Sequence, residues 1–113
     1  MDNCLFCKIA KKELPAEVEY EDEEIIAFQD IRPKAPVHIL IIPKKHIESV
    51  AKMTENDVNI AGRLIYIAKI LAEKKGIAKK GYKLVVNVGR EGGQLIDHLH
   101  LHLLGGQKLE AIV

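Results

Sequence analysis

Two kinds of hydrophobic pattern alternate along the chain and predict a mixed α+β fold. Short apolar runs bounded by charged residues or proline predict β-strands at residues 18–20, 25–28, 37–42, 83–88 and 96–104. Apolar residues at helical spacing predict a short helical stretch at residues 5–12 and a long helix from Val58 to Lys75, with Thr54 as its N-cap. One short helix, three strands, one long helix and two strands are typical of an antiparallel α+β meander.

The size and charge of the chain narrow the class of protein. Its 113 residues suit one domain over residues 1–113. The 17 basic and 16 acidic residues nearly cancel, so neither nucleic acid nor an anionic membrane is expected as a partner. The N-terminus lacks a signal-peptide pattern, and no apolar stretch approaches the roughly 20 residues that span a bilayer. We therefore expect a cytoplasmic protein.

Three histidines alternate with leucines near the C-terminus. On a β-strand the rings of His98, His100 and His102 would share one side, about 6–7 Å apart in succession. An imidazole can attack phosphorus, and neighbouring rings can donate hydrogen bonds to phosphoryl oxygens or transfer a proton. The pattern favours phosphoryl chemistry. Incidental histidines on a solvated strand and a three-histidine metal site remain alternatives.

Two further motifs have more than one interpretation. Gly92 and Gly93 directly precede the histidine run, and glycines let a backbone turn bring N–H groups close to an anion, although a plain β-turn explains them equally well. The spacing of Cys4 and Cys7 fits two buried thiols, a redox pair or half of a zinc site. In addition, the long helix has more apolar positions than one sheet face needs, which indicates a subunit contact.

Taken together, several segments resemble the histidine-triad (HIT) superfamily, most closely its nucleotide-binding phosphoramidase branch. The segments are Cys4–Ile9, Ala27–Ile31, Ala35–His46, Val86–Asn87 and Gly92–Gly106, which cover nearly the whole chain. The resemblance implies a HIT-like fold, with a five-stranded antiparallel sheet, one long and one short helix, and two protomers joined as a homodimer with a continuous sheet.

The resemblance also implies an activity. We expect hydrolysis of a nucleoside 5′-phosphoramidate or related conjugate, such as an AMP-lysine-like P–N compound, releasing a nucleoside monophosphate such as AMP. His100 would form the nucleotidyl-histidine intermediate, and His102 would contact the phosphate and help with proton transfer. A histidine at position 102 marks hydrolases, because nucleotidyl transferases of the superfamily carry glutamine there. His38 would orient the nucleophile's ring, and His98 completes the predicted catalytic set.

Nucleotide-binding positions carry over in the same way. Asp30 would accept the ribose hydroxyls, and Asn87 would sit beside the leaving group. The apolar purine slot would comprise Leu5, Phe6, Ile9, Phe28, Ile31 and Leu40, and the phosphate side Gly93, Gln94 and Leu95 together with His100 and His102. Leu95 departs from the family, which often has serine or threonine there. Asp97 has no explanation at the level of sequence.

The resemblance favours the zinc interpretation of the cysteine pair. It implies a structural zinc held by Cys4, Cys7, His46 and His98, and no catalytic metal. Two other functional classes stay open: a nucleotide-binding protein with weak or vestigial catalysis that acts through a partner, and a zinc-stabilised interaction module.

Overall fold

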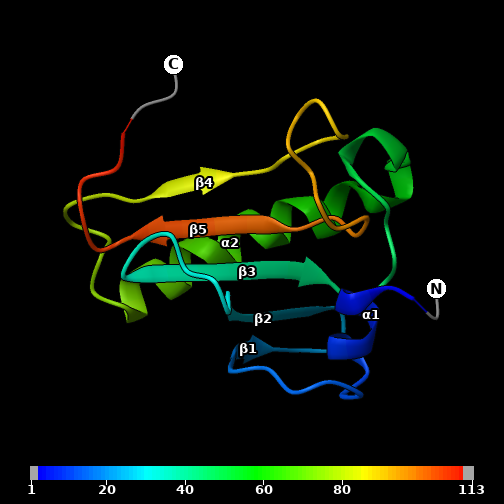
Figure 1. The fold of residues 1–113 in the computed structure, drawn as a ribbon, viewed down its shortest axis with the longest axis horizontal. Coiled ribbons are helices and arrows are strands. Elements are labelled where there is room, and N and C mark those ends of the chain that lie inside the picture. Colours follow the sequence, from blue (N-terminus) through cyan, green and yellow to red (C-terminus); the bar gives the residue numbers. More distant parts are fainter. Residues whose placement is uncertain (1–2, 111–113) are drawn as a thin grey trace.

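A five-stranded antiparallel sheet forms the centre of the protein, as described for residues 3–110 by a computed structural model (Figure 1). Its strands are β1 (Val18–Glu21), β2 (Ile25–Gln29), β3 (Val37–Pro43), β4 (Lys83–Val85) and β5 (Leu101–Gly105). The helices are α1 (Leu5–Ala10) and α2 (Val58–Lys74), with 3-10 turns at Val50–Lys52 and Glu55–Asp57. The α+β class and the five-stranded antiparallel sheet are confirmed. Positions 1–2 and 111–113 of the expected domain lie outside the described residues.

The strand order differs from a simple meander. It is β1-β2-β3-β5-β4, so the last strand inserts between β3 and β4 and leaves β4 at an edge. This order places β5, with His102, directly beside β3, with His38. The two predicted site histidines from distant parts of the sequence therefore lie on neighbouring strands.

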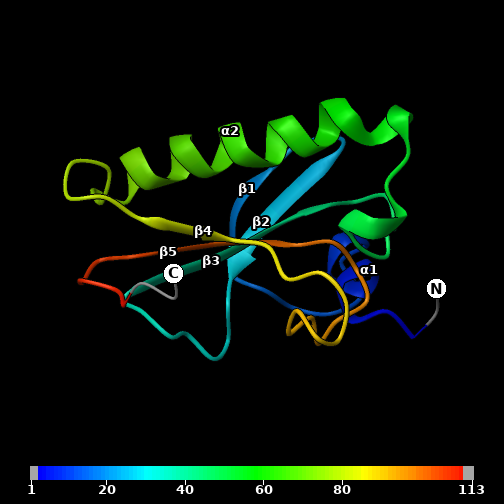
Figure 2. The same cartoon turned by 90° about the horizontal axis from the view of Figure 1, so that it is seen from above.

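The sheet separates two apolar clusters (Figure 2). The period-two alternation of β3 sends Ile39 and Ile41 into the cluster under α2, and Leu40 and Ile42 into the cluster under α1. The helix α2 covers one face along its whole length, whereas α1 and the loop between β2 and β3 lie on the other side of the sheet. The face opposite α2 is thus only partly covered.

The start of the long helix differs in detail from its prediction. Thr54 caps the 3-10 turn Glu55–Asp57, where its hydroxyl accepts a hydrogen bond from the Asn56 N–H, and Asp57 completes a capping box. Asp57 then occupies the N-cap position of α2 without a side-chain cap of its own. Thr54 is therefore a cap, as predicted, but it caps a 3-10 turn that directly precedes α2 rather than α2 itself.

The strands of the histidine region are shorter than predicted. β5 begins at Leu101 rather than Ile96, because the Leu99 N–H donates to the Ile47 carbonyl at 2.7 Å instead of joining the sheet. β4 ends at Val85, and the register that pairs Val85 with His102 would place residue 88 opposite Leu99, outside β5. Alternation nevertheless persists, and Leu99, Leu101 and Leu103 all lie in the core beneath α2.

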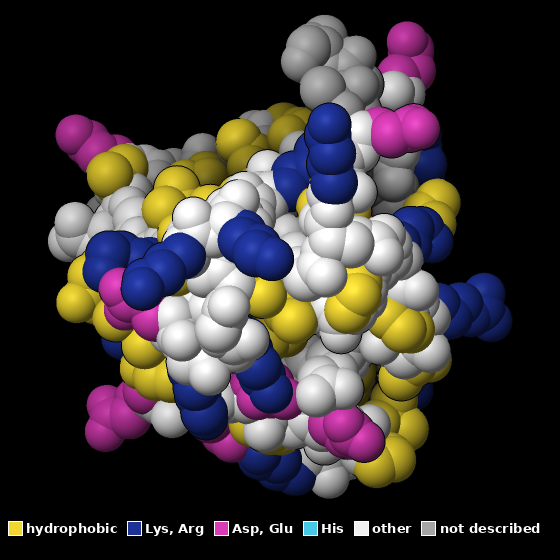
Figure 3. All heavy atoms as spheres, turned by 90° about the vertical axis from the view of Figure 1, so that its left-hand side faces the viewer, with side chains coloured by type: hydrophobic (Ala, Val, Ile, Leu, Met, Phe, Trp, Pro, Cys, Tyr) yellow, Lys and Arg dark blue, Asp and Glu magenta, His cyan; other side chains and the backbone are white. Residues whose placement is uncertain are grey.

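The surface agrees with the nearly balanced charge. The end of the molecule at the left of Figure 1 carries basic, acidic and apolar side chains intermixed, with no large single-sign patch (Figure 3). Within residues 3–110, neither helix combines the length and the apolar character needed to cross a membrane.

Candidate functional site

A pocket of about 850 Å³ lies on the sheet face opposite α2 and gathers most of the predicted site residues. Its lining includes Leu5, Phe6, Ile9, Phe28, Asp30, Ile31, Leu40, Asn87, Gly93 and Leu95, together with His38, His100 and His102. Of the predicted catalytic and nucleotide-binding residues, His98 and Gln94 are missing from this lining. The sequence analysis predicted that the three imidazoles of the histidine run would share one side. Only those of His100 and His102 line this pocket.

Basic residues that the sequence analysis did not identify also line the pocket. Arg32 and Lys34 come from the loop between β2 and β3, and Lys83 comes from the edge strand β4. Their positive charge favours an anionic ligand. No local sequence pattern around these three residues pointed to the pocket.

The tautomer of His100 follows from a single hydrogen bond. Its Nδ1 lies 2.7 Å from the backbone carbonyl oxygen of His98. A carbonyl oxygen only accepts, so Nδ1 carries the proton and donates it. The other ring nitrogen, Nε2, then has a free lone pair, which is the state that a nucleophilic imidazole requires.

His38 and His102 form a second oriented pair. The Lys34 backbone N–H donates to His38 Nδ1 at 3.1 Å, so the proton of neutral His38 is on Nε2. That Nε2–H donates to His102 Nδ1 at 3.0 Å, which leaves the proton of neutral His102 on its own Nε2. His38 thus orients His102, and not the ring of His100 as the sequence analysis had predicted.

Burial keeps both rings of this pair neutral near pH 7. It lowers the pKa of His102 to about 4, with the neighbouring His100 and His38 adding to the effect. Burial also lowers the pKa of His38, although the Asp30 carboxylate, 3.4 Å from His38 Nε2, acts in the opposite direction. The centroids of the His100 and His102 rings are 4.9 Å apart, so a lone pair and a neutral N–H donor stand side by side.

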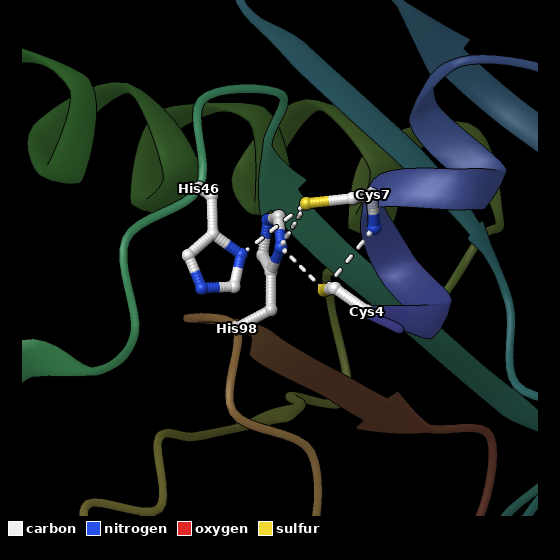
Figure 4. A group of neighbouring side chains, drawn as sticks. All are labelled: Cys4, Cys7, His46 and His98. Carbon is white, nitrogen blue, oxygen red and sulfur yellow. Dashed lines mark hydrogen bonds between the residues drawn. The ribbon is translucent and has the colours of Figure 1, made fainter. Parts of the chain in front are cut away.

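His98 is absent from the pocket lining, and its ring points toward the cysteine pair (Figure 4). Its ring is completely buried, and its Nδ1 lies 3.3 Å from Cys4 Sγ and 3.5 Å from Cys7 Sγ. Its Nε2 lies 2.7 Å from the Pro43 carbonyl oxygen and therefore carries the proton, which leaves the Nδ1 lone pair directed at the sulfurs. His46 approaches from the turn after β3, with Nδ1 3.2 Å from Cys7 Sγ.

These four side chains fit a tetrahedral zinc site. Their ligand atoms all lie within 4.8 Å of one another. Zinc bonds of about 2.0 Å to nitrogen and 2.3 Å to sulfur at the tetrahedral angle place N and S about 3.5 Å apart, close to the separations seen here. Burial lowers the pKa of His98 to about 4, so its ring is neutral, as a ligand must be. In the absence of a cation, burial raises the pKa of Cys7 to about 11.

A second group of possible ligands, Asp30, His38 and His102, fits a metal less well. The only atom that His38 offers toward this group is Nε2, yet the Lys34 N–H at Nδ1 requires Nε2 to carry the proton. Metal binding there would break that hydrogen bond. Of the two groups, the cysteine–histidine cluster is therefore the candidate metal centre.

The turn before the histidine run is held by its own side chains. Gln94 is only 2% exposed, and its amide donates to the carbonyls of Glu48 and Ile96 and accepts from the Gly89 N–H. Its side chain is fully engaged inside the protein rather than in the pocket. Asp97 also gains an explanation, because it pairs with Arg90 across the turn at 2.9 Å.

Asn87 and Gly93 meet at the pocket edge. The Asn87 side-chain amide donates to the Gly92 carbonyl at 2.7 Å. Gly93 has a φ of +87°, and a Cβ atom there would come within 3.4 Å of the Asn87 amide. Glycine is therefore favoured at this position by backbone conformation. Leu95, just beyond, is 84% exposed at the pocket.

Comparison with known proteins gives the family. The HIT domain model matches residues 11–109. The chain belongs to the HIT family. It is 48% identical over 107 residues to the "14 kDa zinc-binding protein" of Zea mays, covering 93% of this chain and 83% of that protein. Among solved structures, the HIT family hydrolase from Legionella pneumophila has a TM-score of 0.94 at 51% identity, covering 96% of each chain. The HIT family hydrolase from Clostridium thermocellum has a TM-score of 0.96 at 49% identity, covering 100% of this chain and 98% of that one.

Proposed function

We propose that this HIT protein hydrolyses the P–N bond of purine nucleoside 5′-phosphoramidates through a nucleotidyl-histidine intermediate on His100. The hydrogen bond from His100 Nδ1–H to the His98 carbonyl is the observation that carries this proposal. It directs the unprotonated Nε2 to act as the nucleophile. The HIT family hydrolases with the same fold support hydrolysis as the reaction class.

The reaction proceeds in two displacements. His100 Nε2 attacks phosphorus, the P–N bond to the leaving amine breaks, and the amine takes up a proton. Water then attacks the same phosphorus and gives its proton to His102 Nε2, the bond to His100 Nε2 breaks, and a nucleoside monophosphate such as AMP is released. Splitting one difficult displacement into two easier ones is the advantage of a covalent intermediate.

His102 is the hydrogen-bond donor for this chemistry. Its Nε2–H is fixed by the bond that Nδ1 accepts from His38, and it donates to the phosphoryl oxygens. A bound phosphoryl group brings negative charge close to the ring, and a nearby opposite charge raises a histidine pKa. The loaded site can therefore take a proton from solvent at His102 Nδ1, which ends the hydrogen bond from His38, and pass the Nε2 proton to the leaving amine.

The rest of the pocket suits a nucleotide. The centroids of Phe6 and Phe28 lie 5.5 Å apart in an edge-to-face arrangement, which forms part of an apolar wall for a purine. Asp30 lines the same pocket, where its carboxylate would accept hydrogen bonds from the ribose hydroxyls, and Arg32 and Lys34 counter the phosphate charge.

Two assembly features belong to this proposal. Zinc bound by Cys4, Cys7, His46 and His98 would hold the segment before β5 against α1, and metal content well below one equivalent per purified chain would contradict it.

A homodimer would cover the exposed apolar side chains of Ile65 and Tyr66 on α2 and of Leu84 on the edge strand β4. Sedimentation equilibrium would measure whether the protein in solution has the mass of one chain or of two.

The deciding experiment compares the protein with His100→Ala on a fluorogenic adenosine phosphoramidate, with AMP affinity measured in parallel. We expect turnover by the protein and essentially none by the variant, with AMP still bound by both. Equal turnover by His100→Ala would refute the role of His100. AMP binding by both without turnover by either would favour a nucleotide-binding protein with vestigial catalysis, which the apolar Leu95 at the pocket supports.

A further inference from the structure

The helix α1 belongs to both the metal cluster and the nucleotide pocket. Cys4 caps the helix, where its sulfur accepts the Cys7 N–H at 3.3 Å, and Cys7 lies one turn further on. Between and beyond these two ligands, Leu5, Phe6 and Ile9 line the pocket. A helix of six residues makes few internal hydrogen bonds and depends on tertiary contacts for its position. Whatever fixes the two sulfurs therefore also fixes this wall of the pocket.

His98 provides a second connection between the same two sites. Its ring faces Cys4 and Cys7, whereas its backbone carbonyl accepts the His100 Nδ1–H in the pocket. The Phe6 ring bridges both, with centroid distances of 6.0 Å to His98 and 5.1 Å to His100, each edge-to-face. A displacement of the His98 ring would reach His100 through the backbone and through Phe6.

We propose that binding of a soft divalent cation by the Cys4–Cys7–His46–His98 cluster is coupled to binding of a nucleotide in the pocket. Each ligand then raises the affinity of the protein for the other. The inference rests on the proposed nucleotide site and adds that the cluster positions α1 and His98 for it. A cation bonded to both sulfurs and to His98 Nδ1 holds the wall and the carbonyl acceptor in the arrangement that a nucleotide needs. Such coupling is reciprocal by thermodynamic necessity.

The coupling is measured as two affinities. The dissociation constant for Zn²⁺ is determined by competition with a chromophoric chelator, with and without saturating AMP, and the constant for AMP is determined with and without Zn²⁺. A titration of the chelator with AMP alone corrects for direct chelation. We expect each ligand to lower the other's dissociation constant by the same factor, within the roughly 5- to 150-fold range typical of coupled sites.

Two variants separate coupling from simple loss of a site. Phe6→Leu keeps an apolar side chain but removes the aromatic contact between His98 and His100, so we expect Zn²⁺ to bind while the coupling factor falls toward one. Val58→Ala is the control, because Val58 lies on α2, across the sheet from the pocket, and its side chain is 59% exposed. We expect it to change AMP affinity at most modestly and to keep the full coupling factor.

The outcomes distinguish the inference from the function on which it rests. If Zn²⁺ and AMP both bind but neither changes the affinity for the other, the inference is overturned while the nucleotide site and the zinc site both stand. If the protein binds no Zn²⁺, the zinc assignment and the inference both fail. If the zinc-loaded protein binds no AMP, the proposed function fails with the inference.

Discussion

Gln94 offers a sharp test of how the histidine segment is held in place. The substitution Gln94→Leu keeps the approximate volume of a side chain that is almost fully buried, but removes its bonds to Glu48, Ile96 and Gly89, which measure 2.8, 2.9 and 2.9 Å. A net contribution of about 0.5–1.5 kcal/mol per hydrogen bond gives a loss of about 1.5–4.5 kcal/mol in the free energy of unfolding for the three bonds. At roughly 4 °C per kcal/mol for a chain of this size, the unfolding midpoint should fall by about 6–18 °C.

Urea denaturation and thermal melting measure this loss directly. Gln29→Leu is the matched control, because the Gln29 amide is exposed and makes one hydrogen bond, to Glu19 at 2.7 Å. Its cost should stay within about 0.5 kcal/mol, as for most surface substitutions. A Gln94→Leu protein as stable as the control would show that the amide does not anchor the turn. The stated role of Gln94 would then be wrong.

Two further predictions concern the pocket. Leu95→Ser should raise kcat/KM for an adenosine phosphoramidate roughly ten- to a hundredfold, because a hydroxyl that bonds a charged phosphoryl group contributes about 1.5–3 kcal/mol; an equal gain with Leu95→Ala would contradict this reason. The pKa values of His38 and His102 in the folded protein lie below the ordinary 6.5. As the pH drops, these histidines therefore take up protons in the unfolded chain before they do so in the folded protein. The free energy of unfolding should fall as the pH drops from 6.5 toward about 4. Urea midpoints across this range should fall less steeply for His102→Gln, and a flat profile for the unmodified protein would refute the depressed pKa values.

Local pattern was sufficient to predict much of the fold. Alternation separated the leucines from the histidines, and the structure places Leu99, Leu101 and Leu103 in the core. Helical spacing located α2, and both signals depend only on neighbouring residues. The start of β5 was not predictable in this way. It depends on a hydrogen bond between Leu99 and Ile47, which are far apart in the sequence.

The site shows the same division between local and long-range causes. The alternating pattern grouped His100 with His102, and the resemblance to the HIT superfamily added Asp30. The structure places all three in one pocket. The roles of His38 and Gln94 were assigned incorrectly because they depend on which atoms lie beside each ring or amide. His38 meets His102 only through the pairing of β3 with β5, and Gln94 meets Glu48 only across a loop.

The start of β5 at Leu101 explains why His98, His100 and His102 have three different environments. Because β5 begins at Leu101, His98 lies outside it, and its ring turns to the cysteines while its carbonyl still reaches the ring two residues later. His102 lies inside the strand and receives its hydrogen bond from the neighbouring β3. A strand extending over all three histidines would pair the carbonyl or N–H groups of residues 98–100 with a neighbouring strand. The contact between Leu99 and Ile47 prevents this, and so it frees the His98 carbonyl to hold the proposed nucleophile.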